Sequence, residues 1–204
     1  MLTTTFTKLH AEPGSAELYK KLAKSLGGVT KYGKDTPIPL DKIIASDGLA
    51  DAIWTMRCTN EPPFMLLLEF ACRCAEHTLP VFEDKYPEDK RVVGAIKAAR
   101  KYFLTDKSDY PKYEADTTHS AHSATHAAYA ACADHETRAA FAAWTVHIAA
   151  DIAADNAHGY QYQASTEHAA QMASNVLYAA HSTWSIDTAE LKWQTDTMLD
   201  LLRE

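Results

Sequence analysis

Apolar residues recur along most of this chain at the three- and four-residue spacing of amphipathic helices, as Leu49, Ile53 and Met56 illustrate. Alanine, which has the strongest intrinsic preference for the helix, is abundant, and no segment shows the β-branched alternation of a strand. The pattern therefore predicts an all-α fold without a sheet. We expect a single-domain multi-helix bundle, or a stack of helical hairpins, with about seven to eight helices.

Residues 1–45 are expected to combine one helix with an irregular connector. Ser15 is a suitable N-cap for a helix that includes LYKKLAKSL, and Gly27 and Gly28 supply a stop. The following stretch, KYGKDTPIPLDK, contains two prolines and a glycine. This composition predicts a connector or a short irregular arm.

Residues 46–105 are expected to form the next group of helices. Ser46 or Asp47 begins the helix GLADAIWTMR, and Pro62 and Pro63 open the one that follows. That second helix contains Pro80, which is expected to kink or divide it, because proline lacks an amide hydrogen and clashes with the preceding turn. The run EDKRVVGAIKAARKYF predicts a further helix.

The remaining block, residues 115–202, is rich in alanine, whose small side chain lets helix axes approach closely. Asp134 and Ser185 are suitable N-caps within it. We expect the three segments to form one helical domain over residues 1–204. The helices expected in the alanine-rich block span residues 115–133, 135–157, 162–182 and 186–202.

The composition is that of an ordinary globular protein, with 47% apolar and 23% charged residues in a chain of 204. No apolar run approaches the roughly 18 residues of a membrane span, and the first residues lack the basic-then-apolar order of a signal peptide. We therefore expect a cytoplasmic protein that does not bind membranes. The cysteines fit a reducing compartment, and we interpret them as small core residues. They are Cys58, Cys72, Cys74 and Cys132.

Charge is divided unevenly between the two halves of the chain. Residues 1–112 carry 17 Lys and Arg against 15 Asp and Glu, a net charge of +2, whereas residues 113–204 carry 3 against 12, a net charge of −9. An acidic surface repels nucleic acid and attracts basic proteins. The distribution therefore disfavours nucleic-acid binding and favours a basic protein partner, and it leaves a homo-oligomer open.

Three histidines share one face of the helix expected at residues 115–133. His119, His122 and His126 fall within about 60° of one another at the 100° per residue of a helix, so the geometry permits a shared ligand. The opposite face holds the alanines, and we therefore favour a solvent-facing surface that is open to a partner over a metal site. The candidate partner-binding residues are His119, His122, His126, Asp116, Asp134, Glu136 and Glu167.

A second polar stripe lies on the next helix, among mostly apolar residues. His147, Asp151, Asp155 and His158 fall within about 80° of one another there. Burying two carboxylates without partners is costly, so the stripe forms either a hydrogen-bonded core network or the wall of a cleft, or else a metal or acid–base site. We favour the structural role, as a network or a cleft wall. His168, on a third polar stripe in the following helix, completes the candidate pocket or metal-binding residues.

Motifs that would identify an enzyme are missing from the sequence, including a Gly-rich phosphate loop, H-E-x-x-H, G-x-S-x-G and a cysteine-based zinc spacing. We therefore assign no catalytic residue and expect no cofactor. The stripe that begins at His147 keeps one alternative open. In it the protein is a metal-dependent hydrolase, or a protein that sequesters a small anionic ligand in a polar pocket between its helices.

The segments GLADAIWTMR and EFACRCAEHTLPVFEDKYPEDKRVVGAIKAARKYF, followed by the alanine-rich block, resemble the immunity protein 5 family of bacterial toxin-immunity proteins. In that family a tryptophan–arginine segment precedes an A-x-x-A-E-x-x-L-P helix, a P-x-D-x-R turn and an A-I-x-A-A-R helix. The resemblance spans roughly residues 48–180. The family usually continues D-R-P-R where this chain has Asp89-Lys90-Arg91-Val92. The matching residues are Asp51, Ala52, Trp54, Arg57, Ala71, Ala75, Glu76, Leu79, Pro80, Pro87, Asp89, Arg91, Ala95, Ile96, Ala99 and Arg100.

The resemblance implies an all-α protein that binds and neutralises a toxin, or a related host effector if a phage or mobile element carries it. In physical terms, we expect Trp54 to lie in the core and Arg73 to join the motif's charged residues in internal ion pairs that order the helices. Pro87, followed by Asp89 in the first turn, is a suitable helix start. The motif residues with expected structural roles are Trp54, Arg57, Glu76, Pro80, Pro87, Asp89, Arg91 and Arg100.

Overall fold

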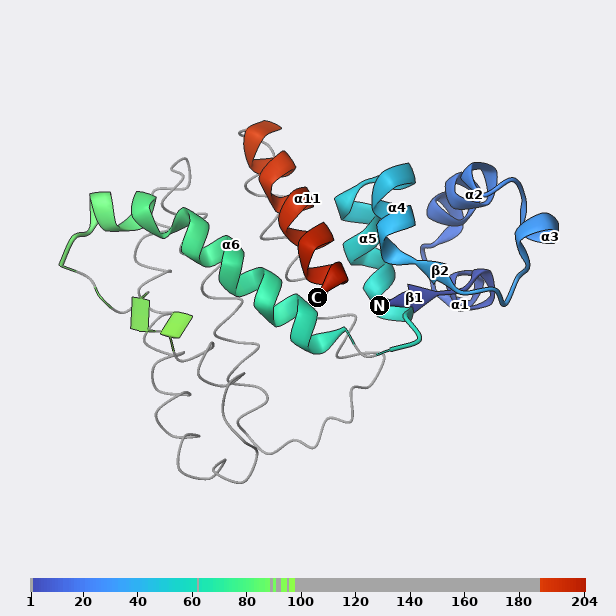
Figure 1. Cartoon of the computed structure of the whole chain (residues 1–204), viewed down its shortest axis with the longest axis horizontal. Coiled ribbons are helices and arrows are strands. Elements are labelled where there is room, and N and C mark those ends of the chain that lie inside the picture. Colours follow the sequence, from blue (N-terminus) through green and yellow to red (C-terminus); the bar gives the residue numbers. More distant parts are fainter. Residues whose placement is uncertain (1, 62, 89, 91–92, 95, 98–187) are drawn as a thin grey trace, which may run out of the picture.

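The computed structural model is mostly helical over the residues it describes, as the sequence pattern predicts (Figure 1). These residues are 2–61, 63–88, 90, 93–94, 96–97 and 188–204. The elements are β1 (Thr3–Thr4), α1 (Phe6–Ala11), α2 (Ala16–Ser25), α3 (Val29–Tyr32), β2 (Ile38–Pro39), α4 (Leu40–Asp47), α5 (Leu49–Thr55), the 3-10 helix η1 (Met56–Cys58), α6 (Phe64–Lys85) and α11 (Thr188–Arg203). The helices expected between residues 115 and 182 lie outside the described residues, so the number of helices in the whole chain stays a prediction.

A small antiparallel sheet corrects the expectation of a fold without strands. β1 pairs with β2 so that Thr3 lies opposite Pro39 and Thr4 opposite Ile38. β2 lies inside the stretch KYGKDTPIPLDK, which the sequence indicated as a connector. Strands of two residues are too short to show an alternating pattern, and their sequence therefore gave no signal. Thr4 and Ile38 are fully buried, so the sheet fixes the N-terminal residues against the core.

The N-terminal strand is held on both of its edges. The amide of Leu40 donates to the carbonyl of Leu2 at 3.2 Å on the β2 side. On the other side, the amide of Asn60 donates to the carbonyl of Thr3 at 2.7 Å, and the amide of Thr3 donates to Glu61 Oε2 at 2.8 Å. Successive residues of a strand direct their backbone groups to opposite edges, which explains this alternation. The segment before α6 is thereby tied to the first residues of the chain.

Helix α2 follows directly from its apolar spacing. Leu18 and Leu22, four residues apart, are buried, and the lysines of the same helix are exposed. The helix ends where the amide of Gly28, with φ of +101°, donates to the carbonyl of Ala23 at 2.8 Å. Ser15 stands before the first residue as expected, but it is buried and its side chain makes no cap hydrogen bond.

The break between α4 and α5 falls at Gly48, whereas the sequence indicated Ser46 or Asp47 as the start of a helix. Ser46 and Asp47 are the last two residues of α4. Gly48 has φ of +93°, a conformation that residues with a Cβ adopt at a cost, and its amide donates to the carbonyl of Ile44 at 3.0 Å. The glycine therefore ends one helix and begins the next.

Helices α6 and α11 lie beside one another and run in opposite directions (Figure 1). α6 continues through Pro80 without a break, so the proline does not divide the helix. α11 starts at Thr188 and ends at Arg203, close to the expected range 186–202. It also contacts α4 and α5, and it is thus placed between the N-terminal elements and α6.

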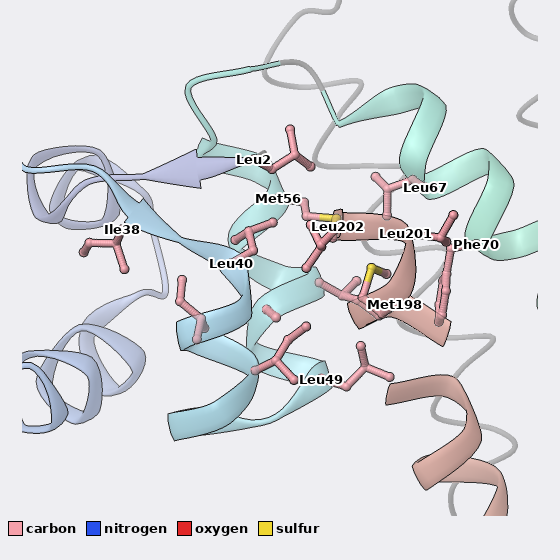
Figure 2. Packing of buried hydrophobic residues seen from close by; sticks show 14 of the residues in the cluster. Leu2, Ile38, Leu40, Leu49, Met56, Leu67, Phe70, Met198, Leu201 and Leu202 are labelled. Atoms are coloured by element: carbon pink, nitrogen blue, oxygen red, sulfur yellow. The ribbon is translucent and has the colours of Figure 1, made fainter. Parts of the chain in front are cut away.

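One hydrophobic core joins the N-terminal elements to α6 and α11. Figure 2 shows Met198, Leu201 and Leu202 of α11 among side chains from other elements, and each of the three is at most 8% exposed. Burial of one such side chain stabilises a fold by about 1.5–3 kcal/mol. α11 is therefore an integral part of the core. The other labelled side chains of the same core in this view are Leu2, Ile38, Leu40, Leu49, Met56, Leu67 and Phe70.

Candidate functional site

An arginine of α6 lies between two carboxylates, one on α6 itself and one directly after the end of α11. Arg73 Nε donates to Glu69 Oε1 at 2.8 Å, and Arg73 Nη2 donates to Glu204 Oε1 at 3.1 Å and Oε2 at 3.2 Å. The hydrogen bond to Glu69 is the largest cause that raises the pKa of the Arg73 guanidinium, and the bond to Glu204 adds to it against the effect of burial. The internal ion pairing expected for Arg73 is confirmed.

An aromatic stack lies farther along the same face of α6. The ring centroids of His77 and Trp193 are 3.7 Å apart, with an angle of 9° between the ring planes. His77 follows Arg73 by four residues, as Arg73 follows Glu69, so the three side chains form one stripe along α6. Aromatic pairs contribute about 0.5–1.5 kcal/mol beyond the area they bury. The stripe therefore gives the α6–α11 contact a fixed register.

Trp54 and Arg57, from the tryptophan–arginine motif, contact each other at the end of α5. Arg57 Cζ lies 5.3 Å from the centroid of the Trp54 ring, a cation–π contact of about 0.5–1 kcal/mol. Trp54 is half-buried and packs against the core, so its expected core position holds for only part of the ring. A Cβ atom on Gly14 would lie 3.9 Å from Trp54 Cζ2, which places the α1–α2 loop beside the ring.

The other motif residues fall on or beyond α6. Glu76 and Pro80 are exposed on that helix, and Pro87 is exposed after its end. Asp89, Arg91 and Arg100 lie outside the described residues. The ion pairs expected of Arg91 and Arg100 stay predictions. The helix does not start at Pro87 as expected, because Pro87 and Glu88 lie in a turn, and the described helical residues after it are 93–94 and 96–97.

The described cysteines are core residues, as the sequence indicated. Cys58, Cys72 and Cys74 are buried and form no disulfide, and Cys132 lies outside the described residues. The Oγ1 atom of Thr4 donates to the carbonyl of Cys58 at 2.7 Å. Burial is the main cause that raises the pKa of the Cys58 thiol to about 11.

Cys58 is expected to resist alkylation at neutral pH and to lower stability in alkali. Its thiol ionises near 9.0 in the unfolded chain and near 11 in the folded protein, so the unfolded chain loses its proton first. The free energy of unfolding should therefore fall as the pH rises from about 9 to 11, by up to ~3 kcal/mol from this group. Alkylation rates and urea midpoints across this range measure the effect, with Cys58→Ala as a matched control. Native Cys58 that reacts as fast as a free thiol would contradict the burial.

The candidate site residues indicated by the sequence are not among those that the structure describes. The candidate partner-binding residues, from Asp116 to Glu167, and the candidate pocket residues, from His147 to His168, all lie outside the described residues. Within the described part of the chain, no group of three or more His, Cys, Asp or Glu side chains is placed to hold a metal ion. No helix of the same part is long and apolar enough to cross a membrane.

Two contacts of the α6–α11 pair could not be predicted from the sequence. Arg73 and Glu204 are separated by 131 positions, and no local spacing links them. The stack of His77 on Trp193 likewise joins two distant segments. Only the pair of Glu69 and Arg73, at a helical spacing of four, could have been found from the sequence.

The described part of the chain is thus mostly helical, and helices from distant segments of the sequence pack into one common core. Comparisons of the chain with models of protein families, with curated proteins and with solved structures found no match. The resemblance to the immunity protein 5 family therefore rests on the motif residues alone and stays a prediction.

Proposed function

We propose that this protein is a non-catalytic cytoplasmic inhibitor, of the immunity type, that binds a basic toxin or other effector protein and occludes it. Its partner is a protein, not a nucleic acid or a membrane. The acidic, alanine-rich half provides the binding surface. The carrier of such an inhibitor is a bacterium, a phage or another mobile element.

The distribution of net charge along the chain supports this proposal. Three acidic side chains, two in α11 and one directly after it, form ion pairs in which a basic side chain offsets the negative charge. These pairs are Asp196 with Lys192, Asp200 with Arg203 and Glu204 with Arg73. Residues 113–187, in contrast, carry eight acidic residues and a single basic one, Arg138. The excess negative charge of the second half therefore resides in those residues, where the candidate partner-binding residues also lie.

Such an excess of negative charge raises the rate of association with a basic partner more than it raises the affinity of the complex. Complementary fields steer two proteins toward a productive encounter, and the effect weakens as salt screens the charges. An inhibitor gains from this property because it must capture a toxin before the toxin reaches its target.

Neutralising the candidate surface is expected to slow capture of the toxin. The variant carries Asp116→Asn, Asp134→Asn, Glu136→Gln and Glu167→Gln. Its association rate constant with a basic toxin that the wild-type protein binds should fall by about tenfold or more at low salt, and the salt dependence of that rate should shrink. Stopped-flow mixing or surface plasmon resonance measures both quantities.

A matched control carries Asp196→Asn and Asp200→Asn, which removes charges that already have partners on α11. This variant should bind the toxin at nearly the wild-type rate. If the association rate fell equally in both variants, the toxin-binding surface would lie elsewhere on the protein. If the wild-type protein formed no complex with the basic toxins tested at low or moderate salt, the inhibitor proposal itself would be wrong.

The second candidate function is a metal-dependent hydrolase, or a protein that binds a small anionic ligand between its helices. It is favoured by the spacing of His147, Asp151, Asp155 and His158 on one helical face, with His168 on the next polar stripe. Elemental analysis of protein purified without a tag is the test. Stoichiometric metal that is lost in Asp151→Ala would support this function. Absence of metal, together with no thermal shift on adding divalent ions, would end it.

A further inference from the structure

We propose that α11 is a clasp, a helix that docks non-covalently on α4, α5 and α6 and thereby holds together the two ends of the chain between Lys85 and Thr188. The chain between these two positions therefore leaves from α6 and returns at α11, two helices that pack against each other. This proposal concerns the described helices, and one of its consequences rests on the proposed function.

The apolar side of α11 is buried in the hydrophobic core. Met198 is fully buried, and Leu201 and Leu202 are 8% and 6% exposed. Gln194 and Thr197, on the same side of the helix, are buried as well. Figure 2 shows Met198 beside Leu49 of α5 and Phe70 of α6, so α11 fills the space between elements that precede it by more than a hundred positions.

Polar contacts determine how α11 sits along α6. Arg73 contacts Glu204, and His77, farther along α6, stacks on Trp193, which comes earlier on α11. A residue later in α6 thus contacts a residue earlier in α11, as antiparallel packing requires. The end of α6 and the beginning of α11 consequently lie at the same end of the helix pair.

If the intervening residues bind a toxin, as proposed above, the clasp fixes the two helices from which that segment leaves and to which it returns. Opening the clasp should then weaken toxin binding although α11 contributes no contact to the toxin. By linkage, bound toxin should in turn make the clasp harder to open.

The clasp is tested in the full chain with a protease site inserted in the segment Ser182–Ser185, just before α11. After cleavage, the C-terminal peptide should remain bound and co-elute with the rest of the protein in gel filtration at micromolar concentration. The variant Met198→Ala should weaken retention of the peptide by about 30-fold or more, because it leaves a cavity in the core. The matched control Asp200→Asn, on the exposed side of α11, should retain the peptide as the wild type does.

Hydrogen exchange of the uncut protein provides a second measurement that does not depend on any variant. Amides from Met198 to Leu202 should exchange as slowly as those of α5. Loss of the peptide from the cleaved wild type, or fast exchange in α11 beside slow exchange in α5, would overturn the proposal. Neither measurement uses a toxin, so failure of the clasp and failure of the inhibitor function are distinguishable.

Discussion

Met198→Asp is expected to lower the free energy of unfolding by roughly 5 kcal/mol or more. Met198 is fully buried, so truncating its packing costs about 2–5 kcal/mol, and a carboxylate without a partner in that position adds several kcal/mol. Domains of this size are stable by only about 5–15 kcal/mol. We therefore expect the variant to lose α11 from the core or to unfold at room temperature. Urea unfolding followed by far-ultraviolet circular dichroism measures the loss.

The conservative variant Met198→Leu controls for size at this position. It retains an apolar side chain of similar volume and should cost less than about 1.5 kcal/mol. If Met198→Asp were as stable as Met198→Leu, the side chain would be exposed in solution and α11 would not be part of the core.

Phe6→Ala is expected to cost about 3–5 kcal/mol, the second-largest effect we foresee. Phe6 is 1% exposed at the first residue of α1. Its ring makes edge-to-face contacts with Tyr19 of α2 at 5.3 Å and with Tyr32 of α3 at 6.1 Å between centroids. One side chain thus joins three short helices, none of which is long enough to be stable alone. The urea midpoint should fall accordingly.

A neighbouring surface variant gives the comparison for Phe6→Ala. His10 lies on the same helix, and its ring centroid is 5.7 Å from that of Tyr19, but its side chain is exposed. His10→Ala should therefore change the free energy of unfolding by about 0.5 kcal/mol or less. Equal losses in the two variants would contradict the central position of Phe6.

The sequence was most informative where a long apolar pattern meets a buried face. α11 falls within two residues of its expected range, and α2 ends just before the predicted glycines, because both helices bury apolar residues at helical spacing. Short elements escaped prediction. α1 has six residues and begins where Thr5 accepts a hydrogen bond from the amide of Lys8, a signal too local to stand out. The two-residue strands carry no periodic pattern at all.

Helix boundaries were set by backbone conformation more than by capping residues. Ser46 and Asp47 are good N-caps in isolation, yet they complete α4 because Gly48 accommodates the positive φ that the turn requires. Ser15 is likewise a good N-cap in isolation, but its hydroxyl is buried before α2 and makes no capping hydrogen bond. A capping propensity cannot reveal which of several adjacent residues the tertiary fold will bury.

The candidate site could be inferred from the sequence only as faces of single helices. Helical spacing places His147 and Asp151 on a common face, but it says nothing about which neighbouring helix that face meets. The contacts of Arg73 with Glu204 and of His77 with Trp193 illustrate the difficulty. Each depends on the packing of two distant helices, and neither partner has a sequence feature that identifies the other.

The position of α11 also determines when this protein can finish folding during its synthesis. Leu49, Met56, Leu67 and Phe70 leave the ribosome early, but the helix that covers them is translated only after residues 86–187. Until then these apolar side chains lack native packing partners from α11, and a nascent chain in that condition is prone to aggregate or to bind chaperones. Slow translation of the second half should thus lengthen the period of exposure, and the yield of soluble protein should then fall.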